Sequence, residues 1–396
     1  MVSDMKLLIY IYLCSINVLS AESVDERRFV NYIDISFLQG MNFEKGASYS
    51  GGNMNSSIGF LYDFNENKSL SLDYLLSYSG PSISYENRFF DERIINHSAM
   101  IEYSTRLSKY VRLRPHIYYG KEYRKDSAIG DFTDNLYNND SKGFGFSMDY
   151  YPSRDNTFTT YMVYRKIEFP NYTDLLYEFL NPGVATEIGG GLYDNNLYRF
   201  GAKLMSGDFF YSVDYTMQRY TNQKIVESDA SYGNDKQKDD EVELKIGMQH
   251  KISDLSIYPA FTYTVHSSNQ NFLRFKSFTD VTPVFIADAY DYKELGFDLP
   301  VYFKFIGLDM NLSAGFKNRD YSKRPPRDSE NNYIYGKKEN DRLFSFSLTA
   351  SKKINDLASF VFYYSIVNSS SNNKFEYYIP FNYTGQMFGI GYKISY

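Results

Sequence analysis

The sequence predicts an all-β fold, a transmembrane up-and-down antiparallel β-barrel of about 16 strands, and three observations lead to this prediction. Apolar and polar residues alternate with a period of two in segment after segment. The connections between these segments are alternately short and long. The chain begins with an export signal and ends on an alternating aromatic strand.

Residues 1–21 have the pattern of a cleavable signal peptide. Lys6 precedes an apolar run from Leu7 to Leu13, and small residues follow at Ser20 and Ala21. The run is too short to span about 30 Å of hydrocarbon as an anchor. We therefore expect residues 1–21 to be removed and residues 22–396 to form a single barrel domain.

Composition restricts the class of protein further. The net charge of −6 gives no reason to expect nucleic acid as a partner. Mean hydropathy is −0.46, which would normally indicate a soluble protein, but only alternate residues of a barrel strand meet lipid. The one cysteine, Cys14, lies within the signal. The mature chain therefore offers neither a disulfide nor a thiolate metal ligand, and we expect no cofactor and no metal.

Period-two alternation defines sixteen candidate strands. In one of them, Phe209, Tyr211 and Val213 share a face, while Ser212 and Asp214 share the other. Without the first candidate, a barrel of fourteen strands is the alternative. The predicted strands are residues 30–38, 54–63, 68–79, 94–106, 109–120, 142–151, 157–168, 197–206, 209–220, 240–251, 255–266, 291–303, 307–317, 341–352, 357–368 and 384–396.

The connections between these strands separate a barrel from a soluble sandwich, because Greek-key connections have no reason to alternate strictly in length. In an outer-membrane barrel, periplasmic turns are tight and extracellular loops are long, so both termini should lie at the end with the tight turns. We expect short turns at 65–67, 107–108, 152–156, 206–208, 253–254, 304–306 and 355–356. We expect long polar linkers at 39–53, 80–93, 121–141, 169–196, 221–239, 267–290, 318–340 and 369–383.

The last strand, Phe388 to Tyr396, carries alternating hydrophobic residues back from a terminal aromatic residue, with Gly391 upstream. It resembles the C-terminal recognition strand of Gram-negative outer-membrane proteins. The resemblance implies that Gly391, Tyr392, Ile394 and Tyr396 form an assembly signal read by the barrel-assembly machinery. Together with the signal at residues 1–21, which predicts Sec-type export, it implies a place in the cell outer membrane, among outer-membrane lipid and lipopolysaccharide.

A second resemblance covers Arg342 to Tyr396, whose serine, asparagine and tyrosine spacing is similar to the end of barrels attached to tetratricopeptide domains, such as the surface lipoprotein assembly modifiers. The helical-repeat domain of that family is missing from this chain. The resemblance leaves an export component as one alternative function, beside a surface adhesin or a structural barrel.

The faces opposite the apolar ones should line the lumen, which sixteen strands make too wide for side chains to fill. This predicts a porin-like channel for diffusion of small polar solutes or ions. The charges either form a transverse field across water, which would filter ions, or neutralise one another in pairs. The predicted pore-lining basic residues are Arg112, Arg114, Arg165, Arg199 and Lys203. The predicted pore-lining acidic residues are Asp214, Glu241, Glu243, Glu294, Asp298 and Asp309.

Two connections have unusual composition. Residues 173–180 could form a short helix with Thr173 as N-cap, and its leucines and Phe179 would enter the lumen as a constriction or pack on other loops as a lid. Residues 227–243 are rich in Asp, Lys and Ser, and we expect a solvated extracellular loop there, with binding of divalent cations as the alternative.

One sequence stretch bears on catalysis. His266-Ser267-Ser268-Asn269 resembles the His-any-Ser-Asn stretch of outer-membrane phospholipases, but Gln270 replaces the following glycine of that family. His266 also falls on the predicted lumen face, whereas a site that hydrolyses lipid must face lipid. We therefore predict no enzyme and no catalytic residue. A homo-oligomer is possible by analogy with large porins alone.

Overall fold

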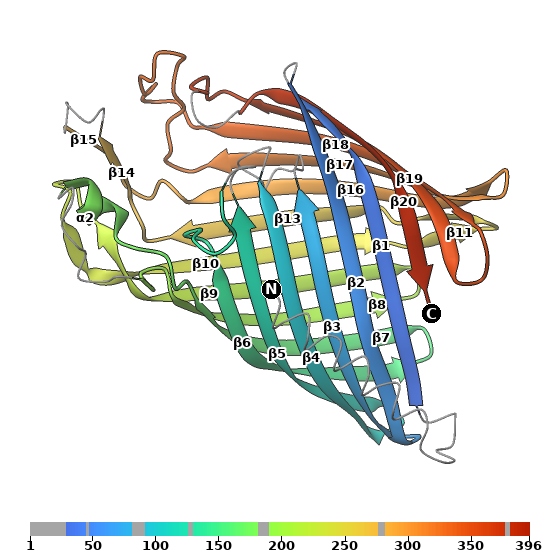
Figure 1. The fold of residues 1–396 in the computed structure, drawn as a ribbon. Helices are drawn as coiled ribbons and strands as arrows, with labels where there is room; N and C mark the ends of the chain where they lie inside the picture. The colour runs from blue at the N-terminus through green and yellow to red at the C-terminus, as the bar shows by residue number, and fades with distance from the viewer. Residues whose placement is uncertain are drawn as a thin grey trace.

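The computed structural model describes residues 29–44, 47–80, 92–125, 130–180, 190–275, 282–376 and 381–396. The described chain forms a closed antiparallel barrel of 16 strands, which confirms the predicted fold class (Figure 1). Its first nine strands are β1 (Phe29–Glu44), β2 (Ala47–Asn65), β3 (Lys68–Gly80), β4 (Arg93–Ser108), β5 (Val111–Lys125), β6 (Asn139–Ser153), β7 (Asn156–Glu168), β8 (Asn195–Ser206) and β9 (Phe209–Val226). The others are β10 (Tyr232–Met248), β11 (His250–Ile252), β12 (Leu255–Ile257), β13 (Ala260–Ser268), β16 (Tyr292–Phe305), β17 (Leu308–Tyr321), β18 (Asn340–Lys353), β19 (Ala358–Ser371) and β20 (Tyr383–Ser395).

The barrel closes where its first and last strands pair. β1 and β20 are antiparallel from Asp34 opposite Ser395 to Glu44 opposite Gly385. The backbones of Ile33 and Tyr396 exchange hydrogen bonds of 2.8 and 3.0 Å. The predicted first strand is therefore confirmed, and sixteen strands are correct rather than fourteen. Closure leaves the barrel sheet without a free edge, so its strands pair with neighbours on both sides.

Two of the predicted strands are interrupted near the short turn that joins them. β10 and β11 are separated at Gln249, and β12 and β13 at Tyr258 and Pro259. Proline has no amide hydrogen to donate to the ladder. The Pro259 carbonyl still accepts a 3.0 Å hydrogen bond from the amide of Met248, which keeps the hairpin together.

The short turns lie together at one end of the barrel, here called the turn end, and both ends of the strand array meet there, as predicted. Two predicted turns are displaced. The turn expected at 107–108 is at Lys109 and Tyr110. The turn expected at 304–306 is at Ile306 and Gly307, and these two residues have positive φ. In each case the strand continues for two residues more before the chain reverses.

The opposite end, here called the loop end, differs from the prediction at two connections. Residues 39–53 and 221–239 were expected to be linkers, but most of them belong to strands, since β9 has 18 residues and β10 has 17. A strand needs only about 9–11 residues to cross the hydrocarbon. These hairpins continue into water, where pairing no longer requires alternation. The expected loop at 227–243 is wrong for the same reason: the connection covers only residues 227–231.

The two faces of the strands separate as predicted. Outward side chains such as Phe144 and Ile390 are 51% and 54% exposed on the isolated chain, whereas the inward Asp149 and Asp214 are each 5% exposed. Outward aromatic rings contact one another across neighbouring strands near both ends. Near the loop end these include Phe144, Tyr164 and Tyr198, and near the turn end Tyr62, Phe64, Tyr103, Phe360 and Tyr392. Aromatic girdles of this kind flank the apolar band of membrane barrels.

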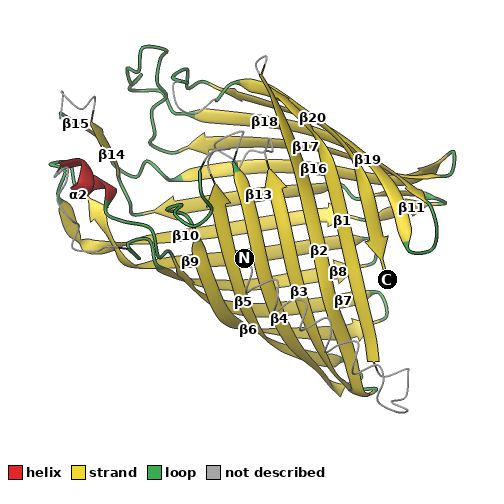
Figure 2. Ribbon diagram, in the orientation of Figure 1, coloured by secondary structure: helices red, strands yellow, loops and turns green. Residues whose placement is uncertain are grey.

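The loop end has a small core of its own. Helix α2 (Leu175–Leu180) and the hairpin of β14 (Phe272–Phe275) and β15 (Pro283–Ile286) lie beyond the barrel strands (Figure 2). The ring of Phe179 stacks on Phe275 with centroids 4.8 Å apart. Of the two placements left open for this helix, the described residues show packing on a neighbouring loop. The flanking residues 181–189 lie outside the described residues.

Candidate functional site: the inward wall of the barrel

Strand register places all the predicted pore-lining residues on the inward face, opposite the exposed apolar side chains. Arg112 pairs with Asp149 across β5 and β6, and Asp214 pairs with Glu243 across β9 and β10. Their strands are neighbours, so residues directly opposite share a face. The inward face carries both signs of charge along most of its circumference.

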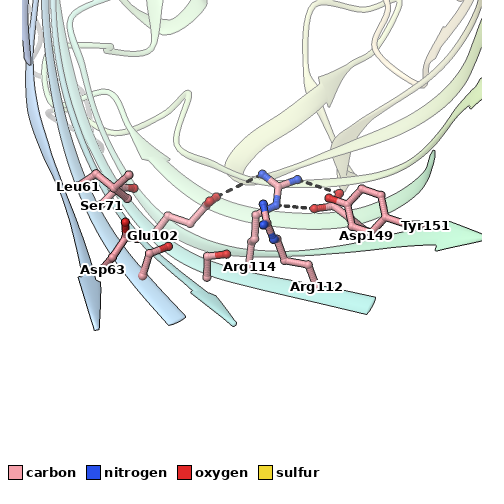
Figure 3. A pocket seen from close by; sticks show the side chains of 10 residues that line it. Leu61, Asp63, Ser71, Glu102, Arg112, Arg114, Asp149 and Tyr151 are labelled. Atoms are coloured by element: carbon pink, nitrogen blue, oxygen red, sulfur yellow. Dashed lines mark hydrogen bonds and ion pairs between the residues drawn. The ribbon is translucent and has the colours of Figure 1, made fainter. Parts of the chain in front are cut away.

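The first charged cluster lies on β4, β5 and β6. The guanidinium of Arg114 donates to both carboxylate oxygens of Asp149, at 2.9 and 3.0 Å, and lies 3.7 Å from Glu102 (Figure 3). Thr159 on β7 donates a further hydrogen bond of 2.8 Å to Asp149. Arg114 is therefore held by a bidentate pair with Asp149 and contacts Glu102 as a second acid.

Arg112 lines the same part of the wall, but unlike Arg114 it has no ion-pair partner among the described residues. A cavity of about 560 Å³ is bounded by Arg112, Arg114, Glu102, Asp149, Asp63 and serines of β3 and β4. Figure 3 shows these side chains pointing from the curved strands into the interior. Among the residues that the structure describes, none forms an ion pair or a side-chain hydrogen bond with Arg112. Its charge is therefore available to a solute.

A second cluster lies on β7, β8 and β9. Arg199 is 3.0 Å from Asp214, and the hydroxyl of Tyr161 donates to the same carboxylate. The ammonium of Lys203 lies 5.4 Å from the centre of the Tyr161 ring. The guanidinium of Arg165 on β7 lies 4.0 Å from the centre of the ring of Tyr118 on β5. Aromatic rings thus support the cations of this wall.

A third cluster lies on β10, β13, β16 and β17. Glu294 is 2.7 Å from Arg319 and 3.8 Å from Lys317. Glu241 lies 3.5 Å from His266, whose ring stacks on Tyr292. The remaining predicted acids lie nearer the turn end: Asp298 beside Gly315, and Asp309, which is 3.9 Å from Lys304.

These contacts favour one of the two interpretations of the charges. Arg114, Arg199 and Glu294 each contact a group of opposite sign on a neighbouring strand. The alternative of opposing basic and acidic walls requires such charges to face water unpaired. Local neutralisation therefore describes these three residues better than a transverse field does.

The comparisons with known proteins give structural neighbours only. No family model matches the chain, and no curated protein matches its sequence. A loop-deletion form of OmpT, an outer membrane protein of Vibrio cholerae, is 11% identical with a TM-score of 0.47 over 93% of this chain and 100% of that chain. CdiB from Acinetobacter baumannii is 11% identical with a TM-score of 0.48 over 92% of this chain and 60% of that chain. A bacterial polysaccharide outer membrane secretin is 9% identical with a TM-score of 0.44 over 93% of this chain and 98% of that chain.

The fold is assigned from features of the molecule itself: the closed strand register, the outward apolar face and the aromatic rings near both ends of the barrel. The fold is that of an outer-membrane β-barrel. Within the described ranges, no helix has the length and apolar character needed to cross a bilayer.

The barrel wall also contains functional candidates that the sequence prediction missed. Arg319 was assigned to a linker because β17 was ended at residue 317, although the alternation of inward residues continues through it. Glu102 was overlooked because it lies between the outward Ile101 and Tyr103 on a strand with few other charges. Continuing the period-two count to the end of each paired segment would have found both.

One sector of the wall has no charged cluster midway along its strands. The inward positions of β18, β19, β20 and β1 there are serines, glycines and other uncharged residues, such as Ser345, Ser347, Ser365, Gly389 and Gly40. Charged inward residues of this sector lie near the ends of the strands. The barrel wall therefore combines a charged sector with a neutral sector, in which small side chains lie beside larger inward ones such as Leu343, Tyr363 and Met387.

The stretch that resembled a phospholipase does not form a catalytic pair. His266 is engaged by Glu241 and Tyr292, and the buried Ser268 hydroxyl accepts a 3.1 Å hydrogen bond from the amide of Gln270. Both residues are inward in the register. Over the described ranges, no group of three or more His, Cys, Asp or Glu side chains could hold a metal ion.

Proposed function

We propose that this barrel is an outer-membrane channel through which small polar solutes or ions diffuse. The observation that carries the proposal is the inversion of the strand faces, apolar outward and polar inward, around a closed ring of 16 strands. A ring of this size encloses more space than its side chains fill. The polar cavity beside Arg112 supports the same conclusion.

The paired charges support a channel of weak selectivity. Ion pairs such as Arg114 with Asp149 neutralise the wall but leave hydrogen-bonding groups facing the interior. Such a wall can form hydrogen bonds with solutes of either charge, whereas an unpaired charge on the wall favours solutes of the opposite charge. Arg112 is an unpaired cation on the wall, and we infer that it favours anions.

Conductance of the purified protein in a planar bilayer tests the proposal. We expect stepwise, long-lived increases in current in potassium chloride, and swelling of liposomes in small sugars. Replacing Arg112 with Ser should raise the potassium-to-chloride permeability ratio by roughly twofold or more. Replacing Arg114 with Ser should raise it as well, because Glu102 and Asp149 lose their cation.

Correct folding is checked by the shift in gel mobility on heating that folded barrels show in detergent. A barrel that passes this check and conducts nothing would refute the channel. A permeability ratio that neither Ser variant changes would remove both arginines from the selectivity-determining wall.

The proposal includes the route to the membrane. We infer that residues 1–21 direct export through a Sec-type signal and are removed, and that Gly391, Tyr392, Ile394 and Tyr396 are read by the barrel-assembly machinery. Outer-membrane lipid and lipopolysaccharide then surround the apolar face, and a homo-oligomer is consistent with the class. Mass spectrometry of protein from outer-membrane fractions should find Glu22 as the first residue. An intact N-terminus in that fraction would contradict the signal.

A second candidate is a surface barrel that binds a partner through its loops, as an adhesin or an export component would. The loop end favours it, because Leu192, Ile286 and Ala289 are buried there at 5%, 8% and 1% exposure. A loop cluster with its own core can present a fixed surface. A closed lumen in bilayer recordings, together with binding to cells, would favour this role over the channel.

A further inference from the structure

Two arginines from different connections converge at the loop end. Arg274 is on β14, and Arg327 is in the connection between β17 and β18. Nη2 of Arg274 donates to the backbone oxygen of Asn331 at 3.2 Å, and Nη1 of Arg327 donates to Oδ1 of the same asparagine at 3.1 Å. Their guanidinium carbons lie 5.1 and 5.9 Å from the centre of one ring, that of Tyr333. All of these shared partners are neutral.

The carboxylates of this region are engaged elsewhere. The buried Glu339 lies 3.1 Å from Arg324 and accepts a 2.9 Å hydrogen bond from Asn373. Asp328, next to Arg327, accepts hydrogen bonds from Asn332 and from the amide of Glu330. Among the described residues, no carboxylate forms an ion pair with Arg274 or Arg327.

The two guanidinium groups are therefore like charges held together and partly desolvated. Nε of Arg274 is buried and has no hydrogen-bond partner among the residues that the structure describes. Burial lowers the pKa of Arg327, and the charges of Arg274 and Arg324 lower it further. Tyr333 and the carboxylate of Glu339 offset only part of this effect. Such an arrangement costs free energy unless an anion lies close by.

The backbone around Arg327 is held in place. Pro325 and Pro326 precede it, and Pro326 is almost fully buried. The carbonyl of Arg327 accepts a 2.7 Å hydrogen bond from Lys374, and its guanidinium carbon lies 4.7 Å from the centre of the Phe375 ring. A group that is already ordered loses less entropy when a ligand binds.

We propose that Arg274 and Arg327 form a binding site for a phosphate group at the loop end of the barrel. A guanidinium presents its donors as a planar fork that matches the oxygens of phosphate. A phosphate at the two forks would also supply the negative charge that Glu339 provides only in part. The phosphate belongs either to a lipopolysaccharide headgroup or to a free phosphate in solution. The site does not depend on whether the barrel conducts.

The test uses the full folded chain in detergent and two probes. Inorganic phosphate is titrated by calorimetry, and retention of lipopolysaccharide is measured by native mass spectrometry, before and after phosphatase treatment of the lipid. We expect the double variant R274Q/R327Q to bind at least about tenfold more weakly to one probe. The matched control K337Q removes an exposed charge from the same connection and should bind as the parent does.

Each outcome decides a different point. Binding of inorganic phosphate alone identifies a free anion, and phosphatase-sensitive retention of lipopolysaccharide identifies the headgroup. The variant R274K/R327K keeps both charges but loses the forks, so intermediate binding is expected. The proposal is overturned if the parent protein binds neither probe, or if R274Q/R327Q binds as tightly as the parent while showing the gel shift of a folded barrel.

Discussion

Gly391 lies in the seam between the first and last strands, where a side chain has no room. A Cβ added there would overlap the backbone carbonyl oxygen of Phe37 on β1. Gly296, also inward on a strand, differs, because its added Cβ would be 3.5 Å from the nearest atom, an ordinary contact. The position of Gly391 thus matters for packing, independently of any assembly signal.

This contrast predicts that G391A destabilises the barrel and that G296A leaves it nearly unchanged. The alanine at 391 forces the β1–β20 pair apart, at a cost of about 1–3 kcal/mol. Urea unfolding in lipid vesicles, followed by gel mobility, measures the difference. Equal midpoints for the two variants would show that the seam adjusts freely.

The residues of the wall show what alternation can and cannot predict. Period two assigned Arg199, Asp214 and Glu294 to the inward face from sequence alone, because a strand leaves no other choice once its outward face is known. The pairing of Arg114 with Glu102 could not be predicted, since it depends on the register between strands. Register is set by turns whose exact positions the sequence leaves open.

Helix α2 shows the same limit in a short element. The sequence predicted a helix ending at Leu180 with Thr173 as its cap, but the helix begins at Leu175 and Asp174 caps it. Oδ1 of Asp174 accepts a 3.0 Å hydrogen bond from the amide of Tyr177, and Tyr232 donates to the same oxygen at 2.6 Å. The cap therefore belongs to the loop cluster as well as to the helix.

D174A should expose the first turn of α2, and T173A should not. Loss of a cap costs about 1 kcal/mol, and loss of the Tyr232 contact adds to it. Hydrogen exchange at the amides of Tyr177 and Glu178 should accelerate several-fold in D174A. If T173A accelerates exchange as much as D174A does, the capping contact of Asp174 is not the specific determinant of this turn.

Adjacent residues of one strand offer a direct test of the two faces. Leu348 of β18 is outward and Ser347 is inward, in the neutral sector of the wall. L348R places a charge in lipid, which costs about 2–4 kcal/mol near the midplane, whereas an arginine at 347 meets water. We expect L348R to lower the unfolding midpoint in vesicles and S347R to retain it. The reverse order would mean that the faces are exchanged.

The whole barrel explains why the fold was more predictable than its use. Alternation recurs in each strand, and short and long connections alternate between them. An error at one strand therefore does not change the architecture. The sequence underestimated the length of strands in hairpins such as β9–β10, because strand residues beyond the membrane need not alternate between apolar and polar. The loop-end core and its arginine pair depend on contacts between distant connections, which no local pattern records.

The charge balance of the lumen wall predicts that two substitutions shift ion selectivity in opposite directions. Glu294 forms ion pairs with Arg319 and Lys317 on the neighbouring strand and offsets part of their charge. E294Q leaves two cations and should shift reversal potentials toward chloride, while R319Q should shift them toward potassium, each by roughly twofold in permeability ratio. S345Q enlarges a side chain in the neutral sector without changing charge, and it should leave the ratio unaltered. Shifts of the same sign in E294Q and R319Q would mean that these residues act through the shape of the wall and not through its charge.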